Sequence, residues 1–267
     1  MNFEIGLMLP DYPPLFWVSA IFCMILIGVT KAGFGSGVGL IATPLMSLFI
    51  PVADAAALLL PLLMTADFIS IRHYWGVFDR RSLLILFLPS LIGIAIGGWF
   101  FHSLSGNDAL LRTSIGVLGL IFVLFQVSRA IIFGALEGYR FPTVVGLLIG
   151  GISGFTSTLV HAGGPPASVY LLPLKLPRQI FVGTILNLFF FMNYIKLIPY
   201  YSLGLLNVGN LTTILLLAPL AFVGVWIGLA LNRRFNEKWF NRVIYTMLFL
   251  VSIQLVVGQS LLKLLWS

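Results

Sequence analysis

The feature that most constrains this chain is a glycine-rich break, KAGFGSGVGLIATP, at Lys31–Pro44 inside a long apolar stretch. Four glycines interrupt what would otherwise read as one continuous helix: Gly33, Gly35, Gly37 and Gly39. Glycine adopts backbone angles that other residues avoid, so the segment is not expected to stay helical throughout. Within a bilayer, such backbone persists only where protein or a water-filled cavity satisfies its polar groups.

A second break, STLVHAGGPP at Ser157–Pro166, lies in the other half of the chain. Its glycines and prolines are again expected to interrupt a helix, because proline lacks the backbone N–H that a helix interior needs. Broken helices in corresponding places of two halves are the best sequence pointer to a transporter's binding site. We therefore predict a polytopic membrane transporter whose substrate lies between the two breaks.

The composition is that of a membrane protein. Apolar residues make up 60% of the chain and charged residues 9%, with a mean hydropathy of +1.08, whereas a soluble domain is roughly 25% charged. The net charge of +7 comes from short basic clusters between apolar runs, so nucleic-acid binding is not expected. The single cysteine, Cys23, excludes a disulfide framework and a cysteine-based metal site. Met1–Pro14 lacks the basic start of a signal peptide, so we expect the first apolar segment to be retained.

Eight apolar segments are long enough to cross a bilayer, since about 20 helical residues span its ~30 Å hydrocarbon core. They are Leu15–Ala32, Val52–Trp75, Leu83–Phe101, Leu110–Phe133, Pro142–Val160, Ile180–Leu203, Val208–Leu231 and Phe240–Leu265. Two further segments, Val38–Ile50 and Ala167–Leu176, are shorter, and each could cross fully or fold back as a re-entrant hairpin. The predicted fold is thus all-α, with eight full-length segments and two short half-helices.

The two halves match at a nearly fixed offset, which indicates an internal duplication. Matched residues lie 126 positions apart in the first six pairs and 130 apart in the last three: Gly28/Gly154, Thr30/Thr156, Gly37/Gly163, Pro51/Pro177, Asp67/Asn193, Tyr74/Tyr200, Pro89/Pro219, Gly98/Gly228 and Arg112/Arg242. We divide the chain into repeat 1, residues 1–134, and repeat 2, residues 135–267.

Basic residues in short loops mark the cytoplasmic side of a membrane. Arg80 and Arg81 therefore place their loop inside, whereas the acidic N-terminus and Asn107–Asp108 are expected outside. Val52–Trp75 then runs inward and its counterpart Ile180–Leu203 runs outward. The repeats are expected to be inverted, each with a broken or re-entrant helix plus three full transmembrane helices, which suits alternating access.

Each break should leave the N-terminus of a half-helix inside the protein, near Val38 in the first case and near Pro165 or Pro166 in the second. Free backbone N–H groups and the positive end of the helix dipole favour an anion there. The alternative is that the glycines serve only close helix packing. Two breaks in matched positions favour the binding-site interpretation.

Ionisable residues inside apolar runs are candidates for function. Lys31 could pair with an anionic substrate or extend to the membrane surface, and Asp67 could carry a proton or balance Lys31 in a buried ion pair. His161 could donate to substrate, couple protons or be structural. Asn193 is the repeat partner of Asp67, and Lys196, one turn further on, is either buried or marks the helix end.

At these same residues the chain resembles the sulfite exporter TauE/SafE family of bacterial permeases. The resemblance rests on GFGSGVGLIATP, on GGPPASVYLLP and on the duplicated apolar layout of nearly the whole chain. It implies outward movement of sulfite, sulfoacetate or related organosulfonates across the bacterial inner membrane. It also implies site-forming roles for Gly33, Gly35, Gly37, Gly163, Gly164 and Pro165. Phe34, Ser36 and Val38 interrupt the run of consecutive glycines that is commoner in the family.

The predicted function is gradient-driven transport of a small sulfur oxyanion, with no cofactor. The residues predicted to bind substrate are Lys31, Gly33, Gly35, Gly37, Thr43, Ser157, His161, Gly163, Gly164 and Pro165, and those predicted to couple protons or ions are Asp67, His161 and Asn193. The expected partners are the small anion and the lipid bilayer, and a homodimer is left open.

Three alternatives remain at this point. The chain could be a permease for a cation or a neutral solute that uses Asp67, a membrane-embedded enzyme, or a non-transporting subunit. An enzyme is not expected, because the three histidines are far apart in sequence and lack metal-ligand spacing. No phosphate-binding lysine loop is present, so ATP is not expected to drive transport.

Overall fold

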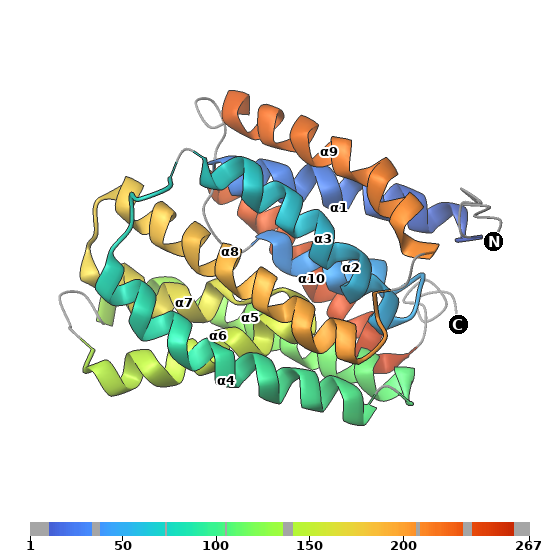
Figure 1. Cartoon of the computed structure of the whole chain (residues 1–267), viewed down its shortest axis with the longest axis horizontal. Helices are drawn as coiled ribbons and strands as arrows, with labels where there is room; N and C mark the ends of the chain where they lie inside the picture. Colours follow the sequence, from blue (N-terminus) through green and yellow to red (C-terminus); the bar gives the residue numbers. More distant parts are fainter. Residues whose placement is uncertain are drawn as a thin grey trace, which may run out of the picture.

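A computed structural model describes residues 11–33, 38–72, 74–104, 106–135, 141–206, 209–231 and 237–258. Within these ranges the chain is helical and contains no strand (Figure 1). The long helices are α1 (Pro14–Gly33), α3 (Val52–Ile71), α4 (Arg80–Leu104), α5 (Asp108–Ala135), α6 (Thr143–Val160), α8 (Arg178–Ser202), α9 (Gly209–Leu231) and α10 (Glu237–Val257). The short elements are the 3₁₀ turn η1 (Val38–Ile41), α2 (Ala42–Met46), α7 (Gly164–Leu171) and the 3₁₀ turn η2 (Leu172–Leu174).

The prediction of an all-α membrane protein is confirmed. Six of the described helices are long and apolar enough to cross a bilayer, namely α1, α3, α4, α5, α6 and α8. The remaining two long helices contain shorter apolar stretches, Thr212–Ile227 in α9 and Arg242–Val257 in α10. The number of eight spans therefore stays a prediction.

Both short stretches cover only about half the depth of a membrane. The helical residues Val38–Met46 and Gly164–Leu174 rise roughly 15–18 Å at 1.5 Å per α-helical and 2 Å per 3₁₀ residue, against a ~30 Å core. Soon after each stretch comes a proline, Pro51 or Pro177, in extended conformation directly before the next long helix. These prolines are 126 positions apart, the offset of the matched residues in the two halves.

The long helices pack in pairs: α4 lies along α6, α1 along α9 and α5 along α10 (Figure 1). Glycines permit the close approach. A Cβ atom at Gly28 would lie 2.5 Å from the backbone nitrogen of Val225 on α9, and one at Gly93 would lie 2.0 Å from the carbonyl oxygen of Gly151 on α6. Small residues at such interfaces allow membrane helices to pack through their backbones.

Helices α3 and α8 occupy the middle of the bundle and contact each other. Each also packs against a helix of the outer pairs, α3 against α9 and α8 against α4. Apolar side chains on the outer helices are exposed, among them Val18, Trp99 and Trp226, as expected where a helix faces lipid. The two central helices thereby place their polar residues away from that surface.

Candidate functional site

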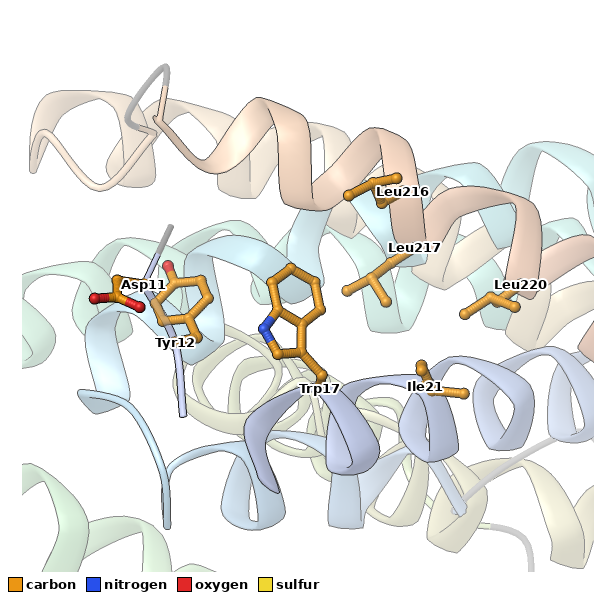
Figure 2. Close-up of a pocket in the computed structure, with 7 residues that line it drawn as sticks. All are labelled: Asp11, Tyr12, Trp17, Ile21, Leu216, Leu217 and Leu220. Carbon is orange, nitrogen blue, oxygen red and sulfur yellow. The ribbon is translucent and has the colours of Figure 1, made fainter. Parts of the chain in front are cut away.

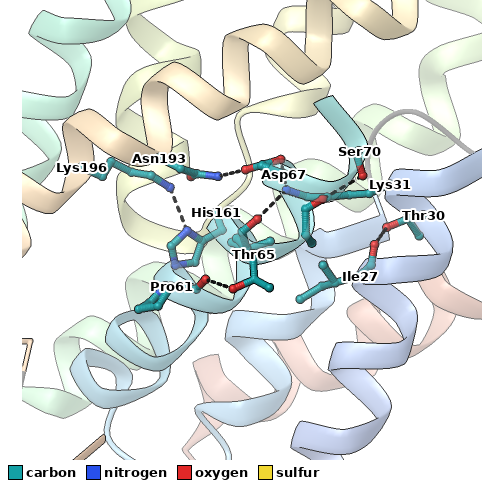
Figure 3. Close-up of polar contacts among 12 residues, drawn as sticks. Ile27, Thr30, Lys31, Pro61, Thr65, Asp67, Ser70, His161, Asn193 and Lys196 are labelled. Atoms are coloured by element: carbon teal, nitrogen blue, oxygen red, sulfur yellow. Dashed lines mark hydrogen bonds and ion pairs between the residues drawn. The ribbon is translucent and has the colours of Figure 1, made fainter. Parts of the chain in front are cut away.

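Five polar side chains from four parts of the chain form one cluster, which we call the lysine–aspartate cluster (Figure 3). Its members are Lys31 in the last turn of α1, Asp67 on α3, His161 directly after α6, and Asn193 and Lys196 on α8. The side chain of Lys31 is 12% exposed and that of Asp67 1%, and Lys196 is 0% exposed. The cluster is thus buried among helices that cross the membrane.

Lys31 and Asp67 form a buried ion pair. The Lys31 ammonium also donates a hydrogen bond to the carbonyl oxygen of Leu63, at 3.2 Å. The other carboxylate oxygen of Asp67 accepts a hydrogen bond from the side-chain amide of Asn193. Both oxygens of Asp67 are therefore engaged, and its negative charge is matched by Lys31.

Lys196 contacts neutral groups. Its Nζ donates to the carbonyl oxygen of Ser157 at 3.1 Å and lies 2.9 Å from Nδ1 of His161. The other ring nitrogen of His161, Nε2, lies 3.0 Å from the carbonyl oxygen of Ala56. A carbonyl only accepts, so Nε2 carries the hydrogen and Nδ1 accepts from the lysine. These partners define a neutral imidazole.

The end of α6 explains the position of His161. Its backbone is left-handed, with φ at 54°, and its N–H donates to the carbonyl oxygen of Ser157 at 3.1 Å. The next N–H, of Ala162, donates to Thr156 at 3.3 Å, and such bonds close the end of a helix. Tyr200, one turn beyond Lys196, donates from its hydroxyl to the carbonyl oxygen of Thr158 at 2.8 Å and so holds α8 against this end.

The cluster has one surplus positive charge. With a neutral His161, two ammonium groups, Lys31 and Lys196, accompany one carboxylate, Asp67. In the described part of the chain, no carboxylate lies within ion-pair distance of Lys196. A buried charge without a partner is costly, and such residues in membrane segments mark substrate and ion pathways. The arrangement is suited to an anion.

The structure brings several of the predicted site residues together. Lys31, Asp67, His161 and Asn193 all belong to the cluster, and the ion pair that was one interpretation of Asp67 is present. Ser157 joins through its backbone carbonyl rather than its hydroxyl. One residue of each break, Lys31 of the first and His161 of the second, therefore belongs to the cluster.

Other predicted residues have no contact with the cluster among those described. The hydroxyl of Thr43 is buried without a hydrogen-bond partner, and the carbonyl of Gly163 accepts from Ser153 at 2.7 Å. Gly33 ends α1 and Gly164 begins α7. Gly35 and Gly37 lie outside the described residues. Helical backbone resumes at Val38 and at Gly164, where half-helices were expected, but anion binding at these ends stays a prediction.

Lys196 was not among the predicted site residues. The signal was present, because it follows Asn193 by three positions within an apolar run. Sequence alone left open whether it was buried or marked a helix end. Only the packing of α8 against the end of α6 shows that the ammonium lies inside.

Two crevices lie away from the cluster. One of about 470 Å³ separates α1 and α9 (Figure 2) and is lined by Asp11, Tyr12, Trp17, Ile21, Leu216, Leu217 and Leu220. Trp17 and Lys31 are 14 residues apart on one helix, which is about 21 Å. The other crevice, about 390 Å³ between α5, α6 and α7, is apolar except for Thr156 and includes Pro165. Neither contains a positive charge, so neither suits an anion.

Comparison with models of known protein families shows the family of this chain. The family model described as Sulfite exporter TauE/SafE matches residues 20–255. The chain belongs to this family. The match spans nearly the whole chain and includes every residue of the lysine–aspartate cluster. No curated protein and no solved structure matches the chain.

Membership of the TauE/SafE family makes the chain a multi-pass membrane protein of a family of permeases rather than of enzymes. The family name refers to sulfur anions, and the surplus positive charge of the cluster is consistent with an anionic substrate. The described residues contain no group of three or more His, Cys, Asp or Glu side chains that could hold a metal ion.

Proposed function

We propose that this TauE/SafE protein is a gradient-driven exporter of small sulfur-containing oxyanions such as sulfite, sulfoacetate or related organosulfonates. The observation that carries the proposal is the surplus charge of the lysine–aspartate cluster, which contains Lys31 of the first break and His161 of the second. A tetrahedral or pyramidal oxyanion offers several acceptor oxygens to the ammonium donors of Lys31 and Lys196. Charge-assisted hydrogen bonds of this kind are stronger than neutral ones.

The same geometry disfavours the alternative that the protein is a cation permease. A cation would need the carboxylate of Asp67, and both of its oxygens already accept from Lys31 and Asn193. It would also have to enter beside two ammonium groups, where like charges repel. The cluster therefore favours anions over cations in charge and in available partners.

Alternating access between two inverted repeats is the proposed mechanism. In the proposed repeat, α1 corresponds to α6, α3 to α8, α4 to α9 and α5 to α10. When corresponding helices are exchanged, the contact between α1 and α9 becomes that between α6 and α4, and the contact between α3 and α9 becomes that between α8 and α4. The structure contains all four of these contacts. The contacts α3–α8 and α5–α10 are left unchanged by the exchange. This agreement supports a two-fold relation between residues 1–134 and 135–267. The proposed topology has eight spans and places the N-terminus outside the bacterial inner membrane, as the basic residues of the short loops indicate.

Rocking of the two repeats about their shared axis would expose the cluster to one side of the membrane and then to the other. In this proposal Lys31 and Lys196 hold the anion, His161 positions Lys196, and Asn193 orients Asp67. Protons could be coupled through Asp67 or through His161, whose imidazole would then gain a proton during the cycle.

Flux into proteoliposomes tests this function. Vesicles preloaded with unlabelled sulfite should take up radiolabelled sulfite faster than protein-free vesicles, and external sulfoacetate or a related organosulfonate should compete. Lys196→Met should abolish the difference, whereas Lys175→Met, which removes an exposed lysine outside the cluster, should not. Competition by cations alone would overturn the proposal. Equal flux with and without a pH gradient would remove its proton-coupling part.

A further inference from the structure

We infer that the site accepts one negative charge per substrate molecule, that Lys196 holds this charge, and that Asp67 sets the number by cancelling the charge of Lys31. The inference rests on the proposed function and adds the charge of the substrate to it. The class selected is the singly charged oxyanion, meaning a sulfonate with no second acid group or a hydrogen-bearing sulfur oxyanion. Among the substrates proposed above, it ranks these ahead of dianions such as fully ionised sulfoacetate.

The Lys31–Asp67 pair carries no net charge. The ammonium touches the carboxylate directly, and Asp67 is 1% exposed. Asn193 saturates the second carboxylate oxygen without adding charge. A substrate that approaches this pair meets no net charge, so the pair contributes orientation and hydrogen bonds but no excess attraction.

Lys196, by contrast, has no carboxylate within ion-pair distance among the described residues. An ammonium group has three N–H donors, and the two described acceptors are the carbonyl of Ser157 and Nδ1 of His161. Both acceptors are neutral, so the protonated ammonium has one donor and its positive charge available for a ligand. At 0% exposure, that charge is not screened by water, so a ligand carrying one negative charge neutralises it.

The other described groups near Lys196 add no further net charge. His161, at the end of α6, is neutral by its two contacts. The hydroxyl of Tyr200, one turn along α8, is used in its bond to Thr158. The charged groups that face this region from α1 and α3 are Lys31 and Asp67. The total is therefore one positive charge, and a dianion would leave an uncompensated negative charge in the same low-dielectric place.

The test uses two tetrahedral probes of similar shape whose charges are fixed near neutral pH, methanesulfonate with one charge and sulfate with two. Thermal stabilisation of purified protein, titrated with each probe, gives a Kd for each, because a ligand that binds only the folded state raises Tm by mass action. The quantity compared between variants is the ratio of the two Kd values.

Wild type and three variants with side chains of similar size differ in the net charge of the lysine–aspartate cluster. Wild type, at +1, should bind methanesulfonate more tightly than sulfate. Asp67→Asn, at +2, should shift the ratio towards sulfate by about tenfold or more, since one buried charge is added a few ångströms from the ligand. Asn193→Asp, at 0, should lose affinity for both probes. The double variant Lys31→Met/Asp67→Asn returns the site to +1 and should return the ratio towards the wild-type value.

Asp67→Asn alone leaves the charge of Lys31 buried without its partner, which is expected to destabilise the fold. The double variant removes both charges of the Lys31–Asp67 pair, so its two Kd values are measured without that unpaired charge. A ratio that is the same in wild type and Asp67→Asn, with both probes still bound, would overturn the charge count but leave anion transport standing. A double variant that resembles Asp67→Asn would overturn the inference that Asp67 acts by cancelling the charge of Lys31. Failure of wild type to bind either probe would overturn the anion site itself, and the proposed function with it.

Discussion

The side-chain amide of Asn193 donates a hydrogen bond to Asp67, which lies 126 positions before it in the chain, at the offset that relates the matched residues of the two halves. In the proposed two-fold arrangement these two residues are equivalent, and equivalent residues touch only near the axis that relates them. The contact also gives a reason for an acid at one of the two positions and an amide at the other. Two carboxylates in this place would repel each other, whereas one carboxylate and one amide form a bond and leave a single negative charge for Lys31.

The proposed inverted relation of the two halves predicts that equivalent residues lie on opposite sides of the membrane. Trp75 and Tyr201 are 126 positions apart, lie at or just beyond the ends of α3 and α8, and are 64% and 79% exposed. In a Cys23→Ala background, a membrane-impermeant maleimide added to intact cells should label Tyr201→Cys and leave Trp75→Cys unlabelled until the membrane is opened. Labelling of both from the same side would contradict the inverted arrangement.

The ion pair between Lys31 and Asp67 predicts strong coupling of their substitutions. Lys31→Met or Asp67→Asn alone leaves a buried charge without its partner, which costs about 3–5 kcal/mol in buried pairs. The double variant removes both charges and should be more stable than either single variant. Thermal unfolding in detergent measures this cycle. Additive effects of the two substitutions would show that the pair is not coupled.

Close backbone contact between α4 and α6 predicts different effects for two glycines at one interface. Gly93→Ala would place a methyl group 2.0 Å from a backbone oxygen of α6 and should cost about 1–3 kcal/mol by overpacking. Gly151→Ala is the matched control, because its nearest neighbour would be 3.8 Å away. Tm should fall for the first and stay or rise for the second. Equal effects would contradict the described packing.

The left-handed backbone of His161 predicts that glycine is tolerated better than alanine at this position. Both substitutions remove the imidazole and its contacts with Lys196 and Ala56. Alanine must also adopt a φ of 54°, which costs an L-residue about 1–2 kcal/mol, whereas glycine adopts it freely. His161→Gly should therefore unfold at a higher temperature than His161→Ala. The reverse order would show that the turn after α6 relaxes when the imidazole is lost.

Much of the fold could be predicted from the sequence, because membrane helices depend on local properties. The predicted segment Leu15–Ala32 lies within one residue of α1 at each end, and Ile180–Leu203 lies within two of α8. Helix ends were less predictable where a polar residue extends a helix beyond its apolar run, as at Arg80 in α4. The break at Gly33 was predicted from glycine spacing, but its path lies outside the described residues.

The candidate site could be predicted only in part. Lys31, Asp67 and His161 could be identified as ionisable residues inside apolar runs, and the offset of 126 pointed to Asn193. Which of them touch depends on how α3 and α8 pack, and periodicity carries no information about that. Lys196 illustrates the limit, because a lysine near a helix end has the same sequence signature whether it reaches the surface or lies 0% exposed beside His161.

The proposed function depends on anion binding by the uncompensated ammonium of Lys196. The most direct measurement is the change in Tm of purified wild type and Lys196→Met on addition of sulfite, with a divalent cation as comparison and Lys175→Met as control. We predict that Tm of wild type and Lys175→Met rises with the logarithm of the sulfite concentration above Kd, that Lys196→Met does not respond, and that the cation has no effect. Stabilisation by the cation alone, or an undiminished response to sulfite in Lys196→Met, would contradict the account.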